Sequence, residues 1–177
     1  SGYAVVAIGL LAATGQVSIK DSIWFTSGTY RLTSIFQYSN TYAGFLLAFF
    51  LAATFAIVNA KRTITACLHA LMLVPIWISF MLTYSRGALV LLPVLVLIVL
   101  VFLRLDKQIA YLGTFIVSLA ASFVILGKYT NYYLDIAPRV MPKTAEDNPY
   151  ILPWKDPSVI RAWVIMLAAS LACALCI

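Results

Sequence analysis

The chain has 177 residues, of which 10% are charged and 63% are hydrophobic, and its formal net charge is +6. Soluble domains carry about 25% charged residues, so this composition excludes a water-soluble globular domain. The positive charge does not indicate a nucleic-acid-binding protein, because the basic residues lie at the ends of apolar runs rather than on one polar face.

Apolar runs separated by short polar breaks predict an all-α fold, a polytopic transmembrane helical bundle that forms a single domain over residues 1–177. At about 1.5 Å per residue, each complete run can cross some 30 Å of hydrocarbon, the fourth only just. The chain begins without Met and stops inside an apolar run, so we expect an internal piece of a longer protein with its last span cut short. The six expected spans are residues 3–19, 41–60, 63–84, 87–103, 109–127 and 161–177.

The connections between these spans predict an orientation. Residues 61–62 and 104–107 are short and basic, and by the positive-inside rule they face the cytoplasm. The connection at 20–40, the turn at 85–87 and a long loop over 128–160 then lie outside. Prolines and aromatic residues gather in 128–160, which favours an ordered or interfacial loop over a seventh span.

A ridge of small residues runs along the second predicted span at four-residue steps. Such a ridge allows a neighbouring helix to approach closely, so we expect it to pack inside the bundle. Its members are Gly44, Ala48, Ala52, Ala56 and Ala60.

Few other residues in the predicted spans offer chemistry. The single histidine, His69, lies near the cytoplasmic start of the third span, and we expect it to be a hydrogen-bonded packing residue. Cysteines, histidine and carboxylates show no spacing typical of a metal site. No metal or other cofactor is therefore expected.

Three arginines are the main candidates for a binding site. Arginine beside hydrocarbon costs about 2.5–3.5 kcal/mol, and membrane proteins retain it mainly for a partner. Arg31, Arg86 and Arg161 each lie where an external connection meets a predicted span. A guanidinium matches phosphate oxygens bidentately, so two or three in one cleft form a diphosphate site. The alternative is that each one extends to the headgroups or pairs with an acid.

Arg86 is the strongest of these candidates. Ser85 and Gly87 flank it at a break between two spans with almost no loop. The turn must be tight, and we expect the backbone there to approach a ligand closely.

Three stretches carry a resemblance to a known family: RLTSIFQYSNTYAGFLLAFF from Arg31, SRGALVLL from Ser85 and VIRAWVIM from Val159. In this order and topology they resemble the O-antigen ligase and O-antigen polymerase superfamily of bacterial membrane glycosyltransferases, over most of the chain from Arg31 to Trp163. The resemblance implies a GT-C-like, metal-independent enzyme of the bacterial cytoplasmic (inner) membrane. Such an enzyme transfers or polymerises glycan from an undecaprenyl diphosphate carrier, at the outer face, to a lipid, polysaccharide or protein acceptor.

The resemblance also implies roles for particular residues. Arg86 and Arg161 would bind the diphosphate as catalytic residues, with Arg31 as a third contact. Second-tier neighbours in substrate binding would be Asn40, Tyr84 and Ser85.

The sequence departs from the family pattern in two ways. The leucine expected four positions after each catalytic arginine is replaced by Val90 and Ile165. The family's external histidine, with a glycine ten positions later, is expected beyond the last span, so we expect this chain to hold an incomplete active site. An acceptor hydroxyl also requires a general base. The acids on the predicted external side are Asp135, Glu146, Asp147 and Asp156, although acids in a long loop are usually solvated.

Two other classes of function stay open. A lipid-linked glycan transporter or flippase would hold the same diphosphate, but it predicts polar residues deep in several spans, where this chain has almost none beyond Ser, Thr and His69. A non-catalytic membrane scaffold would use the arginines as interfacial anchors, and it predicts that all three diverge in space. The sequence does not separate ligase, polymerase and protein O-glycosyltransferase.

Overall fold

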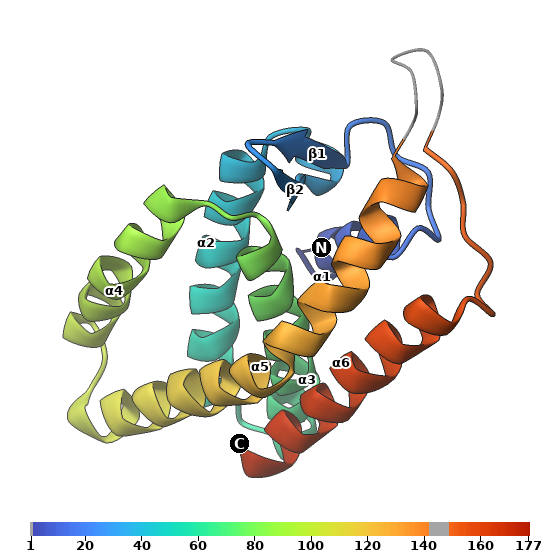
Figure 1. Cartoon of the computed structure of the whole chain (residues 1–177). Coiled ribbons are helices and arrows are strands. Elements are labelled where there is room, and N and C mark those ends of the chain that lie inside the picture. The colour runs from blue at the N-terminus through green and yellow to red at the C-terminus, as the bar shows by residue number, and fades with distance from the viewer. Residues whose placement is uncertain (1, 142–148) are drawn as a thin grey trace.

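The computed structural model describes residues 2–141 and 149–177 (Figure 1). Within these residues the chain forms helices, one short antiparallel hairpin and a 3-10 helix, so the fold is mainly but not purely α. The elements in chain order are α1 (Gly2–Ala13), β1 (Ile23–Thr26), β2 (Thr29–Leu32), η1 (Ser34–Phe36), α2 (Ser39–Val58), α3 (Thr63–Leu82), α4 (Arg86–Val101), α5 (Leu105–Val140) and α6 (Pro157–Cys176).

Four of these helices, α2, α3, α5 and α6, are long and apolar enough to cross a membrane, which indicates a membrane protein. The helices α1 and α4 are apolar but have only 12 and 16 residues. At about 1.5 Å per residue both fall short of roughly 30 Å of hydrocarbon. The expected span at 3–19 is therefore too long, because α1 ends at Ala13, whereas the one at 87–103 matches α4 to within two residues.

The first helix ends early because the chain adopts a helix-terminating turn. Gly15 has a φ of +77°, and the amide of Gln16 donates to the carbonyl of Leu11 at 2.8 Å while that of Gly15 donates to Ala12 at 3.1 Å. This is a Schellman motif, which a residue without a Cβ adopts at low cost. The apolar residues beyond Gly15 are therefore not part of the helix.

The third helix is the centre of the fold, because α1, α2, α5 and α6 all pack against it. Trp77 is 2% exposed. Its indole N–H donates to Ser118 Oγ on α5 at 3.1 Å, and its ring contacts those of Phe50 on α2 and Phe115 on α5, with centroids 4.7 and 5.7 Å away. One side chain thus joins three helices.

At the other end of α3, His69 forms a hydrogen bond with Tyr3 of α1. This confirms the expectation of a hydrogen-bonded packing residue.

The small-residue ridge of α2 does not pack inside the described fold. Gly44, Ala48 and Ala52 are exposed, and α2 instead buries larger residues such as Tyr42 and Phe50. The four-residue spacing did not predict which face of α2 is buried. The large apolar side chains on the adjacent face pack into the interior, because they bury more apolar surface than the small residues do.

The fifth helix corrects the expected boundary at residue 127. It has 36 residues and continues to Val140, so the first part of the expected loop at 128–160 is helical. Tyr129, Tyr133 and Ile136 recur at helical spacing and are buried, which gives this segment a face to pack against the core. Among the prolines that suggested a loop, Pro138 is the one that lies in this helix, in its last turn, and Pro149, Pro153 and Pro157 lie beyond its end.

The connections alternate between the two ends of the fold. In Figure 1 the hairpin and the α3–α4 turn lie at the upper end, whereas the α2–α3 and α4–α5 connections lie at the lower end. The two connections that contain Lys61, Arg62 and Arg104 are therefore at one end, and the hairpin and the α3–α4 turn are at the other.

A cluster of polar residues joins the end of α5 to the start of α6. Arg139 forms an ion pair with Asp156, and a longer one of 3.4 Å with Asp135. Ser158 Oγ donates to Asp135 at 2.7 Å, and Asp156 caps α6 by accepting from the Ser158 amide at 3.0 Å. The hydrogen bond from Arg139 is the main cause that lowers the pKa of Asp156 below its ordinary value of 3.8.

Gly9 of α1 leaves room for the hydroxyl of Tyr42 and for Ser34 of η1, and this predicts a destabilising substitution. A Cβ at Gly9 would lie 2.4 Å from the hydroxyl of the fully buried Tyr42. We expect Gly9→Ala to lower the free energy of unfolding in detergent by about 1–2 kcal/mol, since overpacking outweighs the gain in helix propensity. Gly44→Ala is the matched control, because nothing lies within 4 Å of its added Cβ. A Gly9→Ala protein as stable as Gly44→Ala would contradict this packing.

The Arg139–Asp156 pair predicts an acid-sensitive contribution to stability. Because the pKa of Asp156 is lowered in the folded state, its contribution is complete above pH 3.8 and is lost as the pH falls through the lower folded value. We expect Asp156→Asn to cost up to about 1 kcal/mol at pH 7, and nothing once Asp156 is protonated in the parent protein. Thermal unfolding measured from pH 7 to pH 2.5 tests this, and a constant difference between the two proteins would refute it.

Candidate functional site

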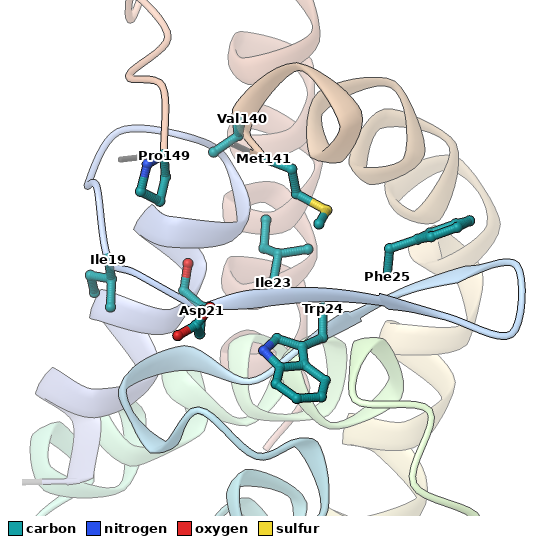
Figure 2. A pocket seen from close by; sticks show the side chains of 9 residues that line it. Ile19, Asp21, Ile23, Trp24, Phe25, Val140, Met141 and Pro149 are labelled. Atoms are coloured by element: carbon teal, nitrogen blue, oxygen red, sulfur yellow. The ribbon is translucent and has the colours of Figure 1, made fainter. Parts of the chain in front are cut away.

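The register of the hairpin determines the position of Arg31. Ser27 and Gly28 form the two-residue turn, and both have positive φ, 51° and 77°, as a type I′ turn requires. Arg31 is then paired directly with Trp24 across the sheet, so their side chains share one face. Figure 2 shows Ile23 and Phe25 on one side of the strand and Trp24 on the other.

The α3–α4 turn places Arg86 as the first residue of α4. Tyr84 has a φ of 50°, the left-handed conformation that reverses the chain direction. Ser85 caps α4 by accepting from the Ala88 amide at 3.4 Å, and its own amide donates to Thr83 Oγ1 at 3.3 Å. The left-handed residue of this turn is Tyr84, whereas Gly87 lies in the first turn of α4.

Arg31 and Arg86 line the same cavity, which we call the arginine cavity. Its volume is about 320 Å³. Hydroxyl-bearing residues from the hairpin turn and α5 line part of it, and apolar side chains of α3, α4 and α5 line the rest. The lining residues are Ser27, Thr29, Arg31, Met81, Tyr84, Arg86, Leu89, Leu126 and Thr130.

Among the described residues, no acid compensates the positive charge of the arginine cavity. No carboxylate is among its lining residues. Within residues 2–141 and 149–177, the ion pairs involve Arg104 and Arg139 but neither Arg31 nor Arg86. The Nε atom of Arg31 is buried and has no hydrogen-bond partner in this part of the chain. An anion with several oxygens is the ligand that satisfies such a site.

The other predicted site residues are distributed unevenly around this cavity. Tyr84 lines it, and Ser85 supports the turn beside it without being a lining residue. Asn40 lies at the start of α2 and lines a neighbouring cavity that also includes Arg31.

Arg161 is not brought to the arginine cavity. It is exposed in the first turns of α6. Figure 1 shows α6 beginning at the right of the view and the α3–α4 turn at the left, with α5 between them. Two of the three arginines therefore share a cavity, and the third stands apart.

The structure describes two of the four candidate general bases. Asp135 and Asp156 are both engaged with Arg139 and Ser158 in the cluster that joins α5 to α6. Glu146 and Asp147 lie outside the described residues. Among the described residues, no group of three His, Cys, Asp or Glu side chains is arranged to hold a metal ion.

Another cavity, of about 210 Å³, lies between β1 and the end of α5 (Figure 2). Ile23 and Phe25 face Val140 and Met141 there. Its lining residues Met141 and Pro149 border residues 142–148, which the structure does not describe.

Sequence reasoning missed the hairpin and therefore Ser27, Thr29 and Trp24. A signal was present, since IWFT and TYRL are rich in β-branched and aromatic residues and flank the dipeptide Ser27-Gly28. Arg139 was missed as well, because the sequence predicted a loop over 128–140. The helix that forms there places Arg139 close to Asp135 and Asp156.

The left-handed conformation of Tyr84 predicts an unusual order of stability. A residue with a Cβ in this conformation costs about 1–2 kcal/mol relative to glycine. We expect Tyr84→Gly to be more stable than Tyr84→Ala by about 1 kcal/mol in thermal unfolding, although both lose the same ring. At the exposed helical position Ala48 the order should reverse, with Ala48→Gly less stable than the parent. Equal stability of the two Tyr84 variants would argue against the left-handed turn.

A comparison of the chain with protein-family models, curated proteins and solved structures finds no match in any of the three.

Proposed function

We propose that this chain is the membrane-embedded part of a metal-independent glycosyltransferase of the O-antigen ligase or polymerase type. It would transfer or polymerise glycan from an undecaprenyl diphosphate carrier at the outer face of the bacterial cytoplasmic membrane. A GT-C-like arrangement with about six spans in residues 1–177, the last of them cut short, is part of this proposal. The observation that carries it is the arginine cavity, in which Arg31 and Arg86 line one space and form no ion pair with any acid of residues 2–141 and 149–177.

The chemistry of the cavity suits a lipid diphosphate. When the bond between the anomeric carbon and the diphosphate breaks, negative charge develops on the leaving group. Two fixed guanidinium groups stabilise that charge without a metal, because they need little reorganisation as the reaction proceeds. Met81, Leu89 and Leu126 supply an apolar wall for the first part of the lipid chain.

The distribution of charge supports the proposed sidedness. Lys61, Arg62 and Arg104 lie in the two connections at the end of the fold opposite the arginine cavity, and Lys107 lies in the first turn of α5 beside them. The positive-inside rule assigns that end to the cytoplasm and thus the cavity to the outer face. A carrier presented at the outer leaflet would reach the cavity from that side.

The other residues take secondary roles in this proposal. Tyr84 contributes to the wall of the cavity, Ser85 holds the turn that presents Arg86, and Asn40 lies beside Arg31. The resemblance assigns Arg161 to the diphosphate as well, but its position on α6 favours a contact elsewhere on the substrate or acceptor.

No observation in the structure specifically favours a transporter or a scaffold. An ion-coupled transporter requires ionisable or strongly polar groups deep in its spans, whereas the polar groups buried in the long helices described here are mainly hydroxyls. Those of Thr54, Ser122 and Ser170 bond to their own helix, and the tyrosine hydroxyls belong to Tyr42, Tyr111, Tyr129 and Tyr133. A scaffold requires the arginines to diverge, whereas two of them share a cavity.

Charge removal at the cavity tests the proposal. We expect inorganic diphosphate to bind the detergent-purified protein, and Arg31→Gln or Arg86→Gln to weaken binding about 10- to 100-fold, as the loss of one charge-assisted hydrogen bond predicts. Isothermal titration calorimetry measures this directly. Arg161→Gln should weaken it less, because Arg161 does not line the cavity.

Arg104→Gln is the matched control, since Arg104 is exposed at the opposite end of the fold and pairs with Asp106 at 3.4 Å. Diphosphate binding that is insensitive to both Arg31→Gln and Arg86→Gln would rule out the arginine cavity as the site. In the proposed reaction, the same two substitutions should abolish glycan transfer.

A further inference from the structure

Arg31 borders a second cavity as well as the arginine cavity. This neighbouring space has a volume of about 170 Å³ and lies between the hairpin and the start of α2. We call it the aromatic cavity. The residues that matter here are Trp24, Arg31, Gln37, Tyr38 and Asn40, all of which line it. Because Arg31 lines both cavities, a ligand group bound to its guanidinium lies between them.

Two exposed aromatic rings face this space from separate elements. Trp24 on β1 is 47% exposed and Tyr38, just before α2, is 62% exposed. Their ring centroids are 6.2 Å apart with the planes inclined at 47°, so the rings form a partly open corner rather than a closed stack. Rings left exposed in this way keep an apolar face available to a ligand.

The remaining lining is rich in groups that both donate and accept hydrogen bonds. Gln37 and Asn40 carry amides, and Thr26 and Ser39 carry hydroxyls, whereas the hydroxyl of Thr33 already donates to the carbonyl of Asp21. A pyranose ring has apolar C–H faces and a rim of hydroxyl groups, and it needs a flat aromatic surface beside mixed donors and acceptors. The volume is below the range of about 300–1,000 Å³ typical of sites for drug-sized ligands, which favours a single ring.

We propose that the aromatic cavity is the subsite for the sugar ring attached directly to the diphosphate. This rests on the proposed function, in which the arginine cavity holds the diphosphate. In a glycosyl diphosphate the anomeric carbon is bonded to a phosphate oxygen, so the first sugar must occupy a space adjoining the phosphate. The aromatic cavity adjoins it through Arg31.

The hairpin register makes this placement specific. Trp24 and Arg31 are directly opposite in the sheet, so the aromatic surface and the guanidinium are held on the same face. Phe25, the next residue, points to the other face and packs against Tyr30 with ring centroids 4.8 Å apart (Figure 2). Adjacent aromatic residues thus differ in whether they reach the proposed subsite.

Binding of sugar 1-phosphates tests the inference. The probes are glucose 1-phosphate, galactose 1-phosphate and N-acetylglucosamine 1-phosphate, each compared with inorganic phosphate by calorimetry on the detergent-purified protein. We expect at least one sugar 1-phosphate to bind about 10-fold more tightly than phosphate, from one aromatic contact and a few hydrogen bonds. Trp24→Ala should remove this preference while leaving the affinity for inorganic phosphate unchanged.

Phe25→Ala is the matched control and should keep the preference. Asn40→Ala, at an exposed position, should reduce it several-fold, and this variant covers the case in which Trp24→Ala fails to fold. A preference that survives both Trp24→Ala and Asn40→Ala, or that is lost equally in Phe25→Ala, overturns the subsite.

The outcomes separate this inference from the proposed function. If phosphate binds in an Arg86-dependent manner and no sugar 1-phosphate binds better than phosphate, the sugar subsite is wrong and the diphosphate site stands. If neither phosphate nor any sugar 1-phosphate binds, both proposals are wrong.

Discussion

The register of one short hairpin determines the composition of the candidate site. A two-residue turn with both residues at positive φ pairs Trp24 with Arg31, and the alternation of side chains along a strand then commits them to the same face. A shift of one residue would turn Arg31 toward the end of α5 and present Tyr30 or Leu32 in its place. Because Arg31 lines two cavities, the charge of one and the aromatic corner of the other both depend on this turn.

The helical core holds the hairpin and the α3–α4 turn in fixed relation. Trp77 joins α2, α3 and α5 near the middle of α3, and Met81 and Tyr84 continue from the same helix toward the arginine cavity. Leu126 and Thr130 reach the cavity from α5. The site is thus built where the ends of packed helices meet an ordered connection, an arrangement that allows polar backbone outside the hydrocarbon while the apolar surfaces stay within it.

Composition and charge placement predicted the helical membrane character, the positions of α2, α3 and α6 to within a few residues, and the hydrogen bonding of His69. They did not predict the end of α1 or the continuation of α5, because apolar content does not reveal a Schellman turn at Gly15, and because Pro138 and the tyrosines of 128–140 are compatible with a helix as well as a loop. Arg31 and Arg86 were chosen from their sequence positions, and the structure brings them to one cavity. Arg161 was chosen on the same grounds and lies elsewhere, since position relative to a span gives membrane depth but not the angle around the bundle.

The fourth helix forms one wall of the arginine cavity and is only partly packed against the rest of the protein. Only Ala88 and Val96 of this helix are fully buried, and Leu92, Leu95, Val99 and Leu100 are partly buried against the core. Its other apolar residues are exposed, yet the helix carries Arg86 and Leu89 into the arginine cavity. Few protein contacts oppose a sideways displacement of α4, so the lateral pressure and acyl-chain order of the bilayer contribute to holding this wall in place. The dimensions of the arginine cavity are in that sense a joint property of the chain and the lipid around it.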